Sequence, residues 1–146
     1  MGEGRLLLDR PRIIVADDHD AMLDIVLSLL RPDFEVVGTV NNGLDLIREA
    51  HRLQPDVIVL DITMLVLNGI EAAHKIHEAG LMMKLVFLTV HEQSSFVNAC
   101  FDEGALGYVT KSRLRTDLIP AIRDAISGHH FISPFLPRGR RQTDLG

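Results

Sequence analysis

Apolar residues along this chain fall into short blocks separated by longer mixed segments. Four blocks have the length of a strand, and most are rich in β-branched side chains. They cover residues 13–16, 57–60, 85–88 and 106–109. Such nearly continuous apolar runs are typical of strands buried on both faces of a parallel sheet. A less uniform run over residues 34–40 predicts a fifth strand at the edge of that sheet.

The segments between these blocks carry apolar residues at helical spacing, three or four positions apart. The patterns lie within residues 22–29, 46–53, 70–76, 96–101 and 118–126. Cys100 stands on the apolar stripe of its segment, so we expect it to pack in the core. Pro120 fits the last helix if that helix begins near Thr116, because first-turn amides have no helical partner.

Strands and helices therefore alternate strictly, in five strand–helix units. This alternation predicts an α/β fold, a doubly wound five-stranded parallel sheet with right-handed crossovers and helices on both faces. We expect the domain to span residues 12–128, after a leader over residues 1–11. Residues 129–146, with Pro134, Pro137 and four basic or glycine positions at 138–141, are predicted to be a linker or tail.

Composition narrows the possible classes of protein. The chain has 146 residues and is 47% hydrophobic, enough for one domain with a real core. No apolar run approaches the roughly 18 residues of a membrane span, so we expect no membrane contact. The single cysteine excludes an internal disulfide and favours a reducing cytoplasm. A net charge of −5 argues against nucleic-acid binding by the chain as a whole.

Polar residues follow directly on the predicted strands. They are Asp17 and Asp18, Asp61, Thr89, and Lys111. Because the carboxyl ends of parallel strands share one edge of a sheet, we expect these side chains to converge there. Clustered carboxylates repel one another and attract a divalent cation; magnesium prefers such oxygen ligands. With an ammonium group and a hydroxyl beside it, this cluster can hold a phosphoryl group that a carboxylate attacks in line.

The order and strand position of these five residues resemble the receiver domains of bacterial response regulators, over about residues 12–128. The resemblance implies a flavodoxin-like sheet of order 2-1-3-4-5, with Asp18 beside Asp61. It implies that Asp61 is the phospho-acceptor and that Asp18 binds Mg²⁺ directly. Asp17 would help through water, and the backbone carbonyl of Thr63 would complete the protein ligands.

The same resemblance gives roles to residues on the last two strands. Thr89 and Lys111 would hold the phosphoryl group and pass on its presence, and Tyr108 would be the rotating aromatic switch. The face made by the fourth helix, fifth strand and fifth helix would then change shape. This implies a signalling module, not an enzyme, with a sensor histidine kinase as phospho-donor and a homodimer on activation.

The end of the chain carries a narrower resemblance. Residues 128–136, with Phe131-Ile132-Ser133-Pro134, look like the segment after the receiver in NarL/FixJ-type regulators. Those regulators carry a DNA-binding helix-turn-helix, so the resemblance implies transcription regulation. DNA would be bound only through an output domain absent from this chain.

One departure and several alternatives stay open. Leu65 replaces the proline usual in the family after Met64, although Gly69 is in register, so the loop over residues 65–67 is more apolar and less constrained. Taken singly, Asp17-Asp18 suits a helix N-cap, Asp61 a turn and Lys111 a solvated charge. A haloacid-dehalogenase-type phosphatase would need a second acid where Thr63 stands. A stand-alone domain or a non-phosphorylated binding module is the other alternative.

Overall fold

A computed structural model describes residues 10–134. Its strands are β1 (Arg12–Ala16), β2 (Glu35–Val40), β3 (Val57–Leu60), β4 (Lys84–Thr89), β5 (Gly107–Thr110) and β6 (Phe131–Ile132). Its helices are α1 (Asp20–Leu30), α2 (Gly43–Leu53), α3 (Gly69–Glu78), α4 (Ser94–Asp102) and α5 (Leu114–Ile126). A short 3-10 turn, η2 (Lys111–Arg113), precedes α5. Most of the predicted leader, and residues 135–146 of the predicted tail, lie outside the described residues.

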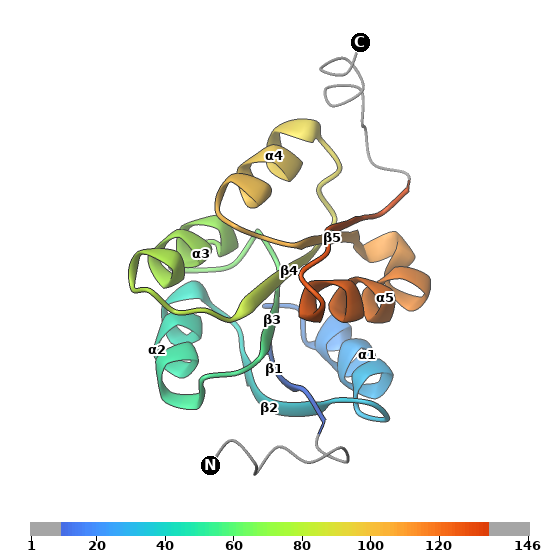
Figure 1. The fold of residues 1–146 in the computed structure, drawn as a ribbon, viewed down its shortest axis with the longest axis horizontal. Coiled ribbons are helices and arrows are strands. Elements are labelled where there is room, and N and C mark those ends of the chain that lie inside the picture. Colours follow the sequence, from blue (N-terminus) through green and yellow to red (C-terminus); the bar gives the residue numbers. More distant parts are fainter. Residues whose placement is uncertain (1–9, 135–146) are drawn as a thin grey trace.

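All strands of the sheet are parallel, in the order β2-β1-β3-β4-β5-β6 (Figure 1). The five strands and five helices expected from the sequence are present, and the predicted order 2-1-3-4-5 is confirmed. The run over residues 34–40 forms β2 at one edge of the sheet, and its partly exposed side chains explain its mixed composition.

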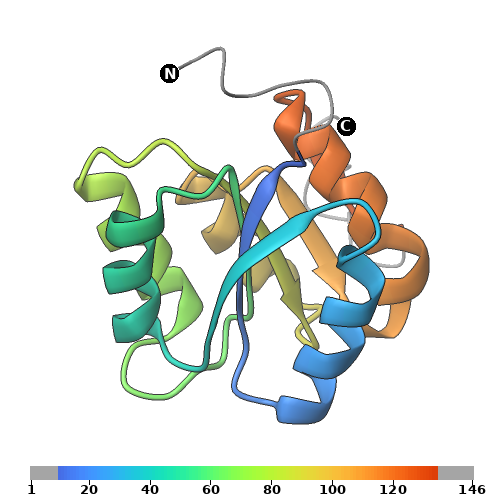
Figure 2. The same cartoon turned by 90° about the horizontal axis from the view of Figure 1, so that it is seen from below.

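Two hydrophobic clusters sandwich the sheet. Helices α2, α3 and α4 pack on one face, and α1 and α5 pack on the other (Figures 1 and 2). The central strands β1 and β3 are therefore buried on both sides, which explains their continuous apolar runs. Cys100 is fully buried in the first cluster, as its position on the apolar stripe predicted. Burial raises the pKa of its thiol well above the ordinary value.

The structure corrects the predicted number of strands. Residues 131–132, which we expected in a linker or tail, pair with β5 and add a sixth strand to the sheet. Ser133, which follows them, is fully buried. A strand of two residues is too short to produce an alternating pattern, so sequence periodicity does not reveal it. The division into leader, domain and linker stays a prediction.

The last helix begins earlier than expected. It starts at Leu114 rather than near Thr116, so Pro120 lies inside the helix and not in its first turn. A proline there removes the N–H that would bond the carbonyl of Thr116. Both residues are exposed, so water can satisfy that carbonyl and the break lies on the face away from the core.

Among the helices of residues 10–134, none has the length and apolar character that crossing a membrane requires.

Candidate functional site

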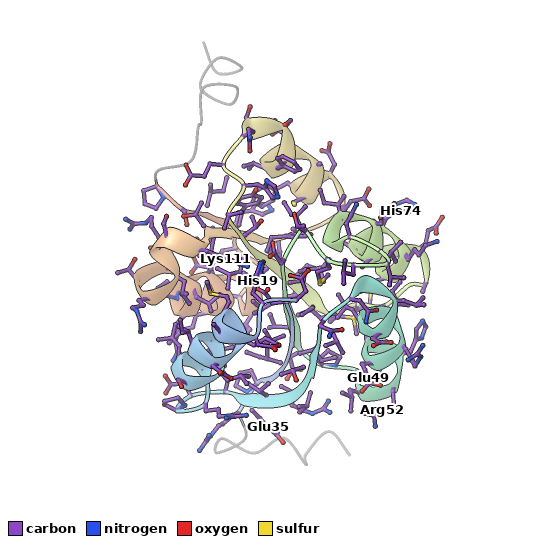
Figure 3. All side chains as sticks on the ribbon, turned by 180° about the vertical axis from the view of Figure 1, so that it is seen from behind. His19, Glu35, Glu49, Arg52, His74 and Lys111 are labelled. Atoms are coloured by element: carbon purple, nitrogen blue, oxygen red, sulfur yellow. The ribbon has the colours of Figure 1, made fainter. Side chains whose placement is uncertain are left out.

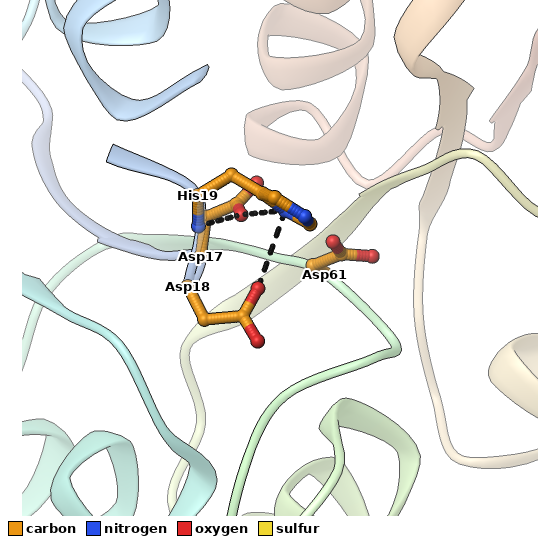
Figure 4. Close-up of side chains that lie close together, drawn as sticks. All are labelled: Asp17, Asp18, His19 and Asp61. Carbon is orange, nitrogen blue, oxygen red and sulfur yellow. Dashed lines mark hydrogen bonds and ion pairs between the residues drawn. The ribbon is translucent and has the colours of Figure 1, made fainter. Parts of the chain in front are cut away.

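The carboxyl ends of β1 and β3 bring three acidic residues together. Ala16 pairs with Leu60 across these strands, so the following residues, Asp17 and Asp61, are also neighbours. The Asp61 amide donates to the Ala16 carbonyl at 3.0 Å, which extends the ladder by one residue. One side-chain atom each from Asp17, Asp18, His19 and Asp61 lies within 4.8 Å of the others (Figure 4). The predicted convergence of acidic groups is therefore present.

Lys111 completes this cluster from the end of β5. Its Nζ atom lies 2.8 Å from Asp61 Oδ2 and 2.8 Å from Asp17 Oδ2. Burial by itself lowers the pKa of Lys111, but its hydrogen bonds to the two carboxylates outweigh burial and raise that pKa. The lysine is therefore charged, and it lies near His19 at this edge of the sheet (Figure 3).

Negative charge exceeds positive charge in this cluster. Three carboxylates face one ammonium group, and the Asp17 and Asp61 residues are only 3% and 2% exposed. The Asp18 Oδ1 atom lies 3.2 Å from His19 Nδ1, yet it is buried with no hydrogen-bond partner. An unpaired buried carboxylate oxygen is costly unless something else binds it. These hard oxygen donors fit a divalent cation such as Mg²⁺.

His19 is a member of the cluster that the sequence analysis missed. Its backbone N–H donates to Asp17 Oδ1 at 2.9 Å, and its ring Nδ1 lies 3.2 Å from the same oxygen. His19 is also the N-cap of α1, so the alternative in which Asp17 or Asp18 caps that helix is wrong. Its position directly after the acidic pair was the available signal.

The backbone of the loop after Asp61 is held by the helices on either side. The Gly69 amide donates to the Ile62 carbonyl at 2.7 Å, and a Cβ atom at position 69 would overlap the Asp61 carbonyl oxygen. Gly43 at the start of α2 approaches the Leu67 carbonyl in the same way. Only glycine permits such close backbone approach, and together these contacts fix where Asp61 lies.

The segment over residues 65–67 is more constrained than expected. Leu65 pairs with Asn42, and the Leu67 amide donates to the Leu65 carbonyl at 2.7 Å across a γ-turn. Val66 at the centre of this turn has φ = 69°, which is strained for a β-branched residue. Leu65 and Val66 are 69% and 79% exposed, so two apolar side chains of the loop that follows Asp61 face solvent.

The two predicted switch residues meet at His91, which the sequence analysis also missed. Thr89 is fully buried, and its hydroxyl accepts a long, 3.4 Å bond from the His91 amide. The Tyr108 hydroxyl donates to the His91 carbonyl at 2.9 Å, and burial raises the pKa of Tyr108. Among the described residues, Thr89 makes no hydrogen bond to Asp61 or Lys111.

The His91 ring contacts two further elements. It lies 2.8 Å from the Thr63 hydroxyl and stacks on Phe96 of α4 at a centroid distance of 4.3 Å. His91 therefore joins the loop after β3 to the start of α4. Thr63 is exposed, and its side chain points into this contact with His91.

Comparison with known proteins identifies the family to which this site belongs. The family model "Response regulator receiver domain" matches residues 13–123. The response regulator GacA of Pseudomonas viridiflava is 33% identical over 125 residues, which cover 84% of this chain and 58% of GacA. The chain thus spans a little over half the length of such curated relatives.

Solved structures of response regulators are also similar to this chain. A LuxR-family two-component response regulator from Aurantimonas sp. SI85-9A1 superposes with a TM-score of 0.86 at 28% identity, covering 94% of this chain and all of that chain. The signal receiver domain of the putative response regulator NarL from Mycobacterium tuberculosis gives 0.79 at 25% identity, covering 83% and 99%. The fold, the acidic edge of the sheet and these likenesses agree: this chain belongs to the response regulator receiver domains of two-component signalling.

Proposed function

We propose that Asp61 accepts a phosphoryl group in a Mg²⁺-dependent reaction, with a sensor histidine kinase as the donor. The observation that carries this proposal is the position of Asp61, buried beside two other carboxylates and bonded to Lys111. The Asp61 Oδ1 atom accepts from the Ile62 amide at 2.7 Å and Oδ2 accepts from Lys111 at 2.8 Å. These bonds orient the carboxylate for attack on phosphorus.

In the proposed transfer, an Asp61 oxygen forms a bond to phosphorus as the bond from phosphorus to the donor imidazole breaks. Lys111 would move its hydrogen bond from the Asp61 carboxylate to an oxygen of the arriving group, since both lie within its reach. Asp18 and Asp61 would bind magnesium directly, Asp17 through water, and the Thr63 backbone carbonyl would complete the protein ligands. The bound cation supplies positive charge at the phosphoryl oxygens.

The proposed response starts at Thr89 and Tyr108. A phosphoryl group adds roughly −1.5 to −2 charge and three strong acceptors. The Thr89 hydroxyl would leave its long bond with the His91 amide and donate to one of these acceptors. Because Tyr108 bonds the carbonyl of the same His91, a shift there would reach the face formed by α4, β5 and α5. We propose that this face then pairs with a second copy.

Control of transcription is a further part of the proposal. It is supported by the likeness of the chain's ending to NarL/FixJ-type regulators and by the response-regulator relatives, of which this chain spans 58%. DNA contact would require an output domain outside this chain. The single, buried cysteine suits the reducing cytoplasm as the setting.

The test is phosphorylation by a small donor. Incubation with Mg²⁺ and acetyl phosphate should add one phosphoryl mass, located on Asp61 by peptide mapping, and EDTA should prevent it. Asp61→Asn should remain unmodified. Asp24→Asn, which changes an exposed aspartate of α1 outside the cluster, is the matched control and should be phosphorylated normally.

Three results would contradict the proposal. Modification at another residue would move the acceptor away from Asp61. No modification at all would favour the non-phosphorylated binding module, for which the exposed Leu65 and Val66 offer contact area. Steady turnover of phosphate esters would instead favour the phosphatase, although Thr63 there bonds His91 and offers no acid.

A further inference from the structure

The outer edge of β5 is covered by the chain itself. After α5 the chain turns back, and the Phe131 and Ser133 amides donate to the carbonyls of Leu106 and Tyr108 at 2.9 and 3.0 Å. Ile132 pairs directly with Tyr108, the residue proposed to rotate. The last strand of the sheet is thus not β5 but β6, which hydrogen-bonds along β5 (Figure 1).

Ser133 fastens this segment to the domain. Its side chain is fully buried; its hydroxyl donates to Asp117 Oδ2 at 2.8 Å and accepts from the Thr110 amide at 3.1 Å. Thr110 immediately precedes Lys111, the lysine of the acidic cluster. Ser133 therefore contacts β5 one residue before Lys111, whose ammonium group bonds Asp61.

The segment also reaches α4. The rings of His130 and Phe101 meet edge to face, with centroids 5.4 Å apart. Residues 130–133 thus contact α4 through His130, β5 through their backbone, and α5 through Asp117. They lie on the α4–β5–α5 face, which we proposed to pair with a second copy. That face is not free in this structure.

We propose that residues 129–133 cap the outer edge of β5, and that a second copy of this chain pairs through the α4–β5–α5 face only once the cap opens. The trigger rests on the proposed phosphorylation, because Tyr108 and Lys111 flank the bonds that hold the cap. Opening leaves the Leu106 and Tyr108 carbonyls and the Thr110 amide unpaired at a sheet edge. Such an edge readily pairs with another chain, and a two-fold arrangement covers it on both copies at once.

The cap is built to open locally. Its strand has two residues, and the segment on its N-terminal side, residues 127–130, is exposed. A two-residue strand at the end of a sheet can open without unfolding the domain. Loss of one buried hydrogen bond should change the open fraction by about tenfold, and loss of both bonds of the Ser133 hydroxyl by at least that factor.

The variant that tests the cap is Ser133→Ala, and its matched control is Thr116→Ala. Both remove a hydroxyl that donates to Asp117, but Thr116 contacts the other carboxylate oxygen and no residue of the cap. We expect the amides of residues 131 and 133 to exchange hydrogen at least about tenfold faster in Ser133→Ala, with unchanged rates in Thr116→Ala. Sedimentation should show more dimer in Ser133→Ala without any phospho-donor.

A second variant avoids the buried site. His130→Ala removes an exposed ring that contacts Phe101, so folding should be unaffected. It should raise exchange at residues 131 and 133 and the dimer fraction in the same direction as Ser133→Ala, by a smaller factor. In the unsubstituted chain, acetyl phosphate should raise both quantities together.

Two outcomes would overturn the cap. If amides 131 and 133 exchange faster in Ser133→Ala but the chain stays monomeric at every concentration, the covered edge is not a pairing surface. If dimers form while these amides keep full protection, pairing does not need the edge. Neither hydrogen exchange nor sedimentation of these variants depends on phosphorylation, which is measured separately by intact mass. Failure of Asp61 to accept phosphate would therefore not be mistaken for failure of the cap.

Discussion

Two buried acidic groups lie on either side of the turn η2, and their surroundings differ. The open cluster contains Asp17, Asp18, His19 and Asp61 with Lys111. The closed cluster contains Asp117 with Arg113, Thr116 and Ser133. In the closed cluster, Asp117 Oδ2 accepts from Arg113 and Ser133 at 2.7 and 2.8 Å, and Oδ1 accepts from Arg113 and Thr116 at 3.1 and 3.0 Å. One carboxylate therefore meets one guanidinium, with both oxygens satisfied.

The open cluster lacks this balance. It has three carboxylates for one ammonium group, and the Asp18 Oδ1 atom is buried without a hydrogen bond. The difference shows how to distinguish a structural acid from a functional one. A buried acid with matched partners stabilises the fold, whereas surplus acid with an unpaired oxygen marks where a cation or a phosphoryl group can bind.

The largest expected effect comes from removing the ammonium group of the open cluster. Lys111→Met should lower the free energy of unfolding by about 3 kcal/mol in metal-free buffer, because two buried carboxylates lose their counter-charge. Mg²⁺ should restore a good part of that loss. Urea unfolding with EDTA or with Mg²⁺ measures both; a loss that magnesium does not reduce would contradict the proposed cation site.

The closed cluster should respond differently. Asp117→Asn should cost about 2 kcal/mol at neutral pH through weakened charge-assisted hydrogen bonds, and magnesium should not change this cost.

The pH dependence of that cost follows from Asp117. Burial alone would raise its pKa, but hydrogen bonds from Arg113, Ser133 and Thr116 lower it below the ordinary 3.8. The stabilisation is therefore present above 3.8 and is lost as pH falls through the lower folded-state pKa. Unfolding curves of the chain and of Asp117→Asn should converge in acid. Curves that stay parallel would contradict this account.

Neutralising one acid of the open cluster should stabilise the metal-free fold, whereas the two preceding substitutions should destabilise it. Asp18→Asn should stabilise the metal-free fold by about 1 kcal/mol, because it reduces repulsion with Asp17 and Asp61 and weakens only the contact with His19. The same variant should lose the stabilisation that Mg²⁺ gives to the unsubstituted chain. Thermal unfolding with and without magnesium measures both. Destabilisation without metal would mean that Asp18 has a structural partner.

The smallest effect concerns backbone strain, which accompanies the open cluster. Val66→Gly should stabilise the fold by about 0.5 kcal/mol, because relief of the positive φ slightly exceeds the entropy that glycine loses. Val66→Ala keeps a Cβ atom and should gain less. Equal stability of all three chains would mean that the turn is not strained.

The sequence predicted those parts of the site that follow closely on a nearly continuous apolar run. Asp17, Asp61 and Lys111 each come after a strand with a clear pattern, so sheet topology alone brings them to one edge. The roles given to them and to Thr89, Tyr108 and Thr63 stay predictions until phosphorylation is tested.

The features that the sequence analysis missed depend on contacts between distant segments, which leave no local sequence pattern. His91 bonds Thr63 across 28 positions, and it gave no signal in its own segment. The buried hydroxyl of Ser133 is hydrogen-bonded to Asp117 and Thr110, which are distant in sequence. The strand before Ser133 is too short to show an alternating pattern of apolar residues. The start of α5 was missed because Leu114, its first residue, directly follows the polar turn η2 and stands apart from the apolar pattern that begins at Leu118.

Gly43 and Gly69 have a consequence for how this domain can diversify. Their close backbone contacts, together with the buried side chains of Ile62 and Met64, hold the loop from Asp61 to Leu67, so the exposed side chains at positions 65 and 66 contribute little to its course. The outward-facing positions 65 and 66 are therefore exchangeable. Substitutions at these two positions can therefore change the surface that the loop presents to solvent while Asp61 stays in place.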